Sequence, residues 1–191
     1  LVAQSHRIFR LIVADQSPDD RLLSTLDGFR DQFEIVRVKS ERGLSRARNA
    51  GLSELGSDVV TFADDDCWYP ADLLGRVNDL LTVNQQWSGL SGQVTDEFGH
   101  PTGARWSTQA GPLDRSSVWT RGTSISIFLR REIVERVGGF DESLGLGSPT
   151  GWGSGEETDY LLRALEHGFA VYYEPTLTVF HHEVRADFTS E

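Results

Sequence analysis

The sequence predicts an α/β domain in which helices flank a mostly parallel central sheet. Short apolar runs alternate with segments of helical periodicity through the first half of the chain, which is typical of βαβ units. The 191 residues suffice for one domain, and 38% hydrophobic with 25% charged residues is an ordinary globular balance. No internal repeat or low-complexity linker divides the chain, so we expect a single domain over residues 1–191.

The first half of the chain alternates predicted strands with predicted helices. Short apolar runs at 11–14 and 35–38 suit strands, and a turn-forming cluster rich in Asp follows the first. Residues 44–55 carry small and apolar side chains at helical spacing. The run at 59–63 is nearly continuous, as in a strand buried on both faces of a parallel sheet. A proline opens a predicted helix over 70–81, which has one apolar stripe.

The second half is less regular. An alternating pattern predicts a strand over 124–129. A glycine-rich stretch at 145–155 leads into a predicted helix over 156–167, and a glycine follows that helix as its stop signal. Two apolar runs predict the final strands at 171–173 and 177–180.

The net charge and the cysteine content limit the classes of binding partner and the cellular compartments that we expect for this chain. A formal net charge of -11 argues against nucleic acid or an anionic membrane surface as the main partner. Cys67 is the sole cysteine, so no intrachain disulfide can form, which suits a reducing compartment. No apolar run is long enough to span a bilayer, and no signal-peptide pattern opens the chain. We therefore expect a cytoplasmic location, free or peripheral to the cytoplasmic face of the membrane, and no membrane segment in this chain.

Three consecutive aspartates follow the apolar run at 59–63. Asp64, Asp65 and Asp66 would lie at the carboxyl end of a strand, where open α/β sheets bind ligands. Adjacent carboxylates repel one another; a divalent cation relieves the repulsion, and all-oxygen ligands favour Mg²⁺ or Mn²⁺. In an extended segment, Asp64 and Asp66 face one side and Asp65 the other. The alternative is a solvated acidic turn, but the place after a buried strand favours a metal site.

Four segments resemble the landmarks of family-2 glycosyltransferases, in order and at family-like spacing. Residues 59–70, Val-Val-Thr-Phe-Ala-Asp-Asp-Asp-Cys-Trp-Tyr-Pro, are similar to the family's strand and Asp-x-Asp motif. The segment before that motif corresponds to 42–52, Arg-Gly-Leu-Ser-Arg-Ala-Arg-Asn-Ala-Gly-Leu. Later landmarks correspond to 137–142, Val-Gly-Gly-Phe-Asp-Glu, and to 155–160, Gly-Glu-Glu-Thr-Asp-Tyr. The resemblance runs from about residue 11 to 182.

This resemblance implies the GT-A fold, a Rossmann-like mostly parallel sheet flanked by helices. It also implies a metal-dependent, inverting transfer of sugar from a nucleotide-diphosphate sugar (UDP-, GDP- or dTDP-linked) to a carbohydrate or other hydroxyl acceptor. Mn²⁺ or Mg²⁺ would be the cofactor. The sequence contains no methionine, and the family's first strand and helix have no counterpart before residue 11. We therefore expect the domain to lack that first strand and helix.

The resemblance gives roles to the aspartates. Asp66 would bind the metal that bridges the two phosphates of the donor. Asp64 would contact ribose or sugar hydroxyls, the metal or its waters, and Asp65 is a further substrate-binding candidate. Asp15, which ends the first strand, would contact the nucleobase; the alternative is an aspartate that caps a turn.

Two arginines precede Asn49 in the second landmark. The fixed donors of Arg46 and Arg48 suit phosphate oxygens or a nucleobase edge. The alternative for either one is a solvated helix face. Arg48 matches the arginine of the family's Ala-Arg-Asn segment, which favours it as a substrate-binding residue.

Acidic residues open the predicted helix at 156–167. In the family, the second acid of a Glu-Asp pair is the general base, and that position here is Glu157. A Glu in place of Asp adds one methylene, so Asp159 stays as the alternative base. Glu156 is a substrate-binding candidate, although acids in a first turn also complement the helix dipole. Trp152, in the glycine-rich stretch, could form a platform for a sugar ring or simply pack.

His181 and His182 follow the last predicted strand. In this fold one histidine near the end of the domain completes the metal site, and the sequence does not choose between the two. A solvated or core histidine is the alternative for each.

Two other functions remain open at this point. A nucleotidyltransferase could use a similar fold and acidic metal site, but it would favour a glycine-rich, basic phosphate loop after the first strand, and none is visible. A non-catalytic sugar- or Ca²⁺-binding domain would keep the acidic triplet but would not need Glu157.

Overall fold

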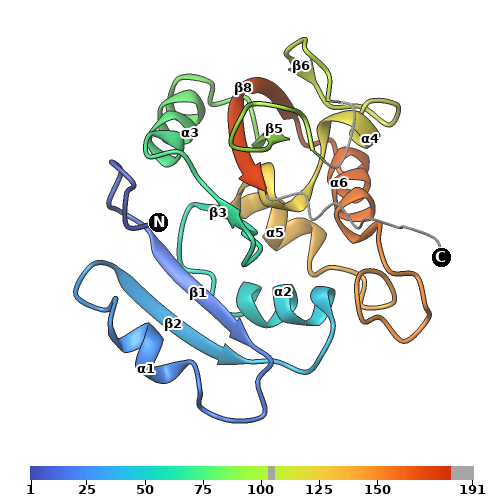
Figure 1. Cartoon of the computed structure of the whole chain (residues 1–191). Coiled ribbons are helices and arrows are strands. Elements are labelled where there is room, and N and C mark those ends of the chain that lie inside the picture. Colours follow the sequence, from blue (N-terminus) through green and yellow to red (C-terminus); the bar gives the residue numbers. More distant parts are fainter. Residues whose placement is uncertain (103–105, 182–191) are drawn as a thin grey trace, which may run out of the picture.

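The computed structural model describes residues 1–102 and 106–181. Its first unit is a two-stranded parallel sheet of β1 (Arg10–Asp15) and β2 (Glu34–Lys39), in register from Arg10 opposite Glu34 to Asp15 opposite Lys39. The short helix α1 (Leu23–Asp27) connects the strands, and α2 (Leu44–Leu52) packs against β1 (Figure 1). Both predicted strands and the predicted helix in this region are confirmed, although α2 ends at Leu52.

The second unit is a six-stranded sheet. Its main path runs β3, β7, β5, β8, β4, and β6 pairs with β8. The strands are β3 (Val59–Thr61), β4 (Cys67–Trp68), β5 (Gly89–Thr95), β6 (Gly111–Pro112), β7 (Ile127–Arg130) and β8 (Val171–His181). In this sheet β5 and β8 are parallel, and the other pairs are antiparallel.

The α/β class and the helix-flanked central sheet are confirmed, but the pairing is more mixed than the predicted mostly parallel sheet. Antiparallel neighbours need no helical crossover between them. Strand β7 pairs antiparallel with both β3 and β5, and β4 pairs antiparallel with the end of β8. Hydrophobic periodicity reports which faces of a strand are buried and carries no information on its direction, so the sequence could not reveal this.

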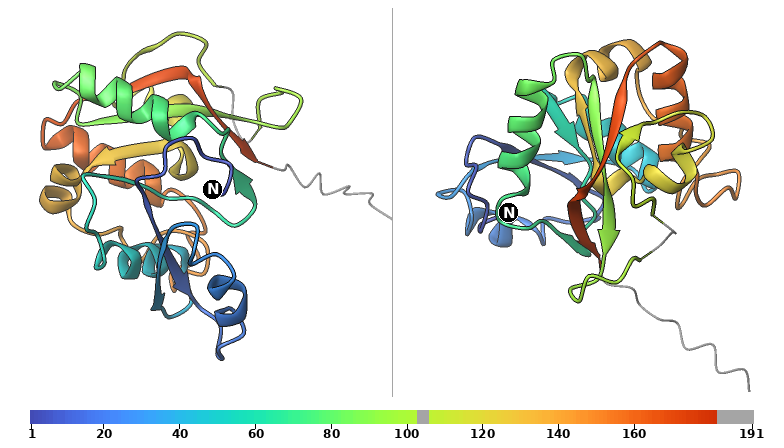
Figure 2. Two further views of the ribbon diagram at one scale, coloured as in Figure 1. Left: turned by 90° about the vertical axis from the view of Figure 1, so that its left-hand side faces the viewer. Right: turned by 90° about the horizontal axis from the view of Figure 1, so that it is seen from above.

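Helices cover both faces of the larger sheet. They are α3 (Leu73–Val83), α4 (Val118–Arg121), α5 (Arg131–Val137) and α6 (Glu156–Glu166). Figure 2 shows α3 and α6 on opposite sides of the sheet. Strand β7 contributes side chains to the hydrophobic cores on both faces of this sheet. Ile127 and Leu129 pack on the side of α5 and α6, and Phe128 packs on the side of α3. The predicted helices over 70–81 and 156–167 are confirmed as α3 and α6.

Two strand predictions differ from the structure. Within 124–129, Ser124–Ser126 forms a 3₁₀ turn, in which the Ser126 N–H donates to the Thr123 carbonyl at 3.1 Å and the Ser126 hydroxyl donates to the Gly92 carbonyl at 2.9 Å. The runs at 171–173 and 177–180 form one strand, β8, which continues through its proline. The pairing of β8 with β5 is interrupted by a register shift between Ser91 and Gln93 of β5. Gly92 lies there, and a Cβ on it would come within 2.1 Å of the Leu177 carbonyl oxygen.

Candidate functional site

The acidic triplet lies in the turn between β3 and β4. Asp64 is half-buried, whereas Asp65 and Asp66 are exposed. Strand β4 pairs with the end of β8 and places Cys67 opposite His181. As a result, the His181 Nε2 atom lies 3.3 Å from Asp66 Oδ1. The pairing of two strands more than a hundred residues apart thus brings together two of the predicted metal ligands, Asp66 and His181.

Arg48 is the centre of the buried part of the site. Its Nη1 donates to Glu156 Oε1 at 2.8 Å, and its Nη2 donates to Asp64 Oδ1 at 3.4 Å. The Arg48 and Glu156 side chains are only 6% and 5% exposed. Arg48 therefore does not lie on a solvated helix face, and it joins the acidic turn to the start of α6.

Asn49 fixes the third landmark to α2. Its side-chain Oδ1 accepts the Phe140 backbone N–H at 2.7 Å, and its Nδ2 donates to the Phe140 carbonyl at 3.0 Å. The preceding Gly139 lies so close that a Cβ there would be 2.7 Å from Asn49 Oδ1. Sequence reasoning missed this role. The signal was present: an amide next to Arg48, and a Gly-Gly pair in the segment that it clamps.

An aromatic stack lies beneath these polar groups. The Phe140 ring stacks on Tyr160 at a centroid distance of 4.3 Å and meets Phe62 edge-on at 5.0 Å. The Arg48 guanidinium carbon lies 5.3 Å from the centroid of Phe140. Phe62 precedes the acidic turn and Tyr160 belongs to α6, so the stack holds three of the four landmark segments together.

The glycine-rich segment at 145–155 packs against the start of α2. The Leu44 N–H donates to the Leu146 carbonyl at 2.9 Å, and the Ser45 hydroxyl donates to the Leu144 carbonyl at 2.7 Å. Gly145 has φ +91°, and a Cβ there would be 3.1 Å from Glu156 Oε2. The segment therefore covers Glu156, and its Trp152 side chain is left 70% exposed.

The two candidate bases have different surroundings. Burial, with the charge of Glu156 as the next cause, raises the pKa of Glu157. Asp159 accepts a hydrogen bond from Arg163 at 2.8 Å, and the same guanidinium donates to the carbonyls of Val137 and Gly139. Asp159 is thus engaged in an ion pair along α6, whereas Glu157 has a raised proton affinity.

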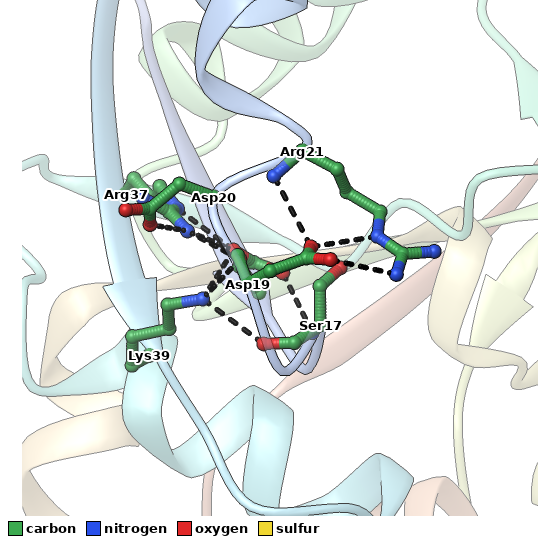
Figure 3. A network of polar contacts seen from close by, with 7 residues as sticks. Ser17, Asp19, Asp20, Arg21, Arg37 and Lys39 are labelled. Atoms are coloured by element: carbon green, nitrogen blue, oxygen red, sulfur yellow. Dashed lines mark hydrogen bonds and ion pairs between the residues drawn. The ribbon is translucent and has the colours of Figure 1, made fainter.

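Asp15 is buried in a separate network at the end of β1. Figure 3 shows the surrounding part of this network, with Ser17, Asp19, Arg37 and Lys39. Its Oδ1 accepts the Ser17 N–H at 2.8 Å, and its Oδ2 accepts Arg37 Nε at 2.7 Å and Lys39 Nζ at 3.1 Å. The Ser17 hydrogen bond is the main reason why the pKa of Asp15 lies far below its usual range. Lys39 also donates to the carbonyls of Ser17 and Asp19, so the network organises the loop after β1.

The remaining predicted residues lie at the edge of the site or outside the description. Arg46 pairs with Glu41 at 2.8 Å and with Glu142 at 3.4 Å on the surface. His182 lies outside the described residues.

Over residues 1–102 and 106–181, no three Asp, Glu, His or Cys side chains form a group that could enclose a metal ion. In the same part of the chain, no helix is long and apolar enough to cross a membrane.

Comparison with known protein families gives a match to glycosyl transferase family 2 over residues 1–138. The succinoglycan biosynthesis protein ExoM of Rhizobium meliloti is 27% identical over 175 residues, which cover 87% of this chain and 54% of ExoM. The pre-mycofactocin glycosyltransferase of Mycobacterium tuberculosis is 29% identical over 160 residues, or 78% of this chain and 32% of the relative. The chain thus spans about half, or less, of the length of these relatives.

Solved structures give the same fold. Staphylococcus aureus TarS superposes with a TM-score of 0.76 at 16% identity, over 98% of this chain and 34% of TarS. The mannosyltransferase PcManGT of Pyrobaculum calidifontis, in complex with GDP-Man and Mn²⁺, gives a TM-score of 0.66 at 16% identity, over 96% of this chain and 51% of PcManGT. The chain has the GT-A fold, as its sequence predicted.

Proposed function

The chain belongs to glycosyl transferase family 2, and from that premise we propose that it transfers a sugar from a nucleotide-diphosphate sugar to an acceptor hydroxyl, with inversion. One observation carries this proposal: Arg48 joins Asp64 of the acidic turn to Glu156 at the start of α6, and His181 pairs with Asp66 of the same turn. Neighbour structures add support for the donor class, since TarS residues 1–349 form a complex with UDP-GlcNAc and PcManGT one with GDP-Man. A carbohydrate or another hydroxyl compound would be the acceptor.

A divalent cation, Mn²⁺ or Mg²⁺, fits Asp66 and His181. The two side chains lie 3.3 Å apart and both are partly exposed, so a cation from solvent can reach the carboxylate and the imidazole together. Such cations are commonly held by one or two protein groups plus the phosphates of a substrate, so a three-ligand protein cage is not required. When bound, the cation would act as a Lewis acid on the diphosphate leaving group. Asp64 borders this position, and Asp65 is exposed next to it.

Glu157 is proposed as the general base. Its carboxylate would take the proton of the acceptor hydroxyl while that oxygen attacks the anomeric carbon of the donor and the nucleoside diphosphate leaves from the opposite face. The raised pKa supports this role, because a base with higher proton affinity is better matched to neutral pH. Asp159 is the weaker candidate, since Arg163 already neutralises it.

Two residues are proposed to serve substrate binding at the periphery, and Asp15 is proposed to shape a nearby loop. The exposed Trp152 could meet a sugar ring, and Arg46 is accessible enough to exchange its surface partners for a phosphate. Asp15 has both carboxylate oxygens engaged by its own network. We therefore assign it to shaping the loop that would face the nucleobase, rather than to direct contact.

The test is a panel of UDP-glucose, UDP-GlcNAc, GDP-mannose and dTDP-glucose with MnCl₂, followed by thermal shift and by release of nucleoside diphosphate. A ligand present at about 100 times its Kd stabilises the native state by about 2.7 kcal/mol, which corresponds to a rise in Tm of roughly 5–10 °C. We expect one nucleotide class to give this shift and slow release of its diphosphate. A panel without any shift or turnover contradicts the proposal.

A further inference from the structure

Arg48 joins two carboxylates that belong to different walls of the site. Glu156 opens α6, and Asp64 lies in the turn after β3; the two nitrogens Nη1 and Nη2 of one guanidinium reach both. We propose that Arg48 is a positioning residue, which uses Glu156 to hold the start of α6 at a fixed place relative to the acidic turn. This inference rests on the proposed function, because it concerns the relative positions of base and donor.

The burial of Glu156 determines what this residue can do. Oε1 of its carboxylate accepts Arg48 Nη1, and Oε2 faces Gly145, where even a Cβ would approach to 3.1 Å. With its side chain 5% exposed, Glu156 has no free surface for a sugar. The structure therefore assigns it a positioning role in place of the substrate contact that the sequence predicted.

Stability alone does not explain the choice of an ion pair here. Buried ion pairs are often replaceable by apolar side chains of similar volume without loss of stability, because desolvation of the charges offsets their attraction. The specific property of arginine is its rigid fork, which presents two donors at a fixed angle. Phe140, beneath the guanidinium, and Asn49, which clamps the Phe140 backbone, orient that fork.

The neighbouring residue in the chain gives the arrangement its consequence for the reaction. Glu157 follows Glu156 in the first turn of α6, so a shift of the helix start moves the proposed base with it. Transfer requires the acceptor oxygen, the base and the donor carbon in line, and a displacement of about 1 Å can cost about 100-fold in rate. A loosened Arg48 contact should therefore lower kcat much more than it changes the KM for donor.

Three variants separate positioning from stability. Arg48→Lys keeps the buried charge but cannot reach both carboxylates. Arg48→Met leaves the buried Glu156 carboxylate without its cationic partner. This change should lower Tm by roughly 6–20 °C, the scale for breaking a buried ion pair in a chain of this size. The double variant Arg48→Met/Glu156→Met removes both charges and should recover most of that Tm. Arg130→Met is the matched control, because Arg130 donates to the Trp87 and Leu81 carbonyls on the far side of β7 and touches no site residue.

Steady-state kinetics would use the nucleotide-sugar of the panel that the parent turns over. We expect Arg48→Lys and the double variant to lose about 10- to 100-fold in kcat with donor KM within about threefold, whereas Arg130→Met keeps the parental kcat below its Tm. Amide hydrogen exchange of residues 144–158 should rise in Arg48→Lys and in the double variant, and not in the control. Parental kcat and parental exchange in the Tm-recovered double variant would overturn the inference. If the parent turns over no donor, the proposed function fails, and the exchange experiment still decides whether Arg48 positions α6.

Discussion

The chain surrounds its acids with cations in two different ways. At the end of β1, each acidic side chain forms an ion pair with a neighbouring cation. Asp15 pairs with Arg37 and Lys39, Asp19 pairs with Arg21, and Asp20 also pairs with Arg37. The pKa of Asp15 lies far below its usual range, mainly because of the Ser17 N–H. Every charge in this network has a partner within the fold.

At the proposed active site the balance is reversed. Arg48 alone pairs with both Asp64 and Glu156, and burial raises the pKa of Asp64 in spite of that arginine. Burial and the Glu156 charge raise the pKa of Glu157 as well. Carboxylates that have few cationic neighbours are typical of sites that bind a metal ion or a proton during function. The comparison supports our proposal that the β1 network serves the fold and that the Arg48 region serves chemistry.

The largest effect should come from the base. Glu157→Gln keeps the size of the side chain but cannot take a proton, so transfer should slow by about 10²–10⁴-fold while donor affinity stays near the parental value. In the parent, the rate should fall as the pH is lowered through the raised pKa of Glu157, because protonation removes the base. Kinetics as a function of pH and calorimetry of donor binding measure the two quantities.

Asp159→Asn is the matched control for that change. It lies two residues further along α6, and its ion pair with Arg163 supports a structural role for this carboxylate. We expect its kcat to remain within about threefold of the parent, since a half-exposed pair contributes about 1 kcal/mol or less to stability. An inactive Asp159→Asn beside an active Glu157→Gln shows that the base has been assigned to the wrong residue.

The next effect concerns the metal requirement. His181→Ala removes one of the two proposed protein ligands, so the Mn²⁺ concentration for half-maximal donor binding should rise by about 10-fold or more. The same titration of His182→Ala should match the parent. Two unchanged curves would remove both histidines from the metal site.

The smallest effect on function, and a clear effect on stability, is expected for Asp15→Asn. Nucleotide affinity should stay within about threefold of the parent while Tm falls, because Arg37 loses a buried anionic partner. A carboxyl whose folded pKa is depressed stabilises the native state above its unfolded pKa of about 3.8, and this contribution is lost as the pH falls below that value. The Tm difference between parent and variant should therefore shrink in acid. A variant with parental Tm but weak nucleotide binding would give Asp15 a direct role.

The sequence predicted local structure well and distant contacts only through motifs. Periodicity located α2, α3 and α6, because an amphipathic pattern reports a buried face. It could not show that β4 meets the end of β8, since pairing direction and partner are set by the whole fold. The sequence placed Arg48 on a helix, but its burial depends on Glu156, 108 residues away. Asn49 was missed for the same reason: its partner is the Phe140 backbone far along the chain, although the Gly-Gly pair before Phe140 was a local signal.

In our proposal, the acidic turn beside Arg48, and not the β1 network, binds the donor diphosphate together with a metal. Calorimetric titration of UDP and GDP, with MnCl₂ and with EDTA, tests it directly in the parent, Asp66→Ala and Asp15→Asn. We expect Mn²⁺ to strengthen nucleotide binding in the parent and in Asp15→Asn, and to have no effect in Asp66→Ala with its fold intact. Equal affinity with and without metal in the parent, or a metal dependence that survives Asp66→Ala, contradicts the claim.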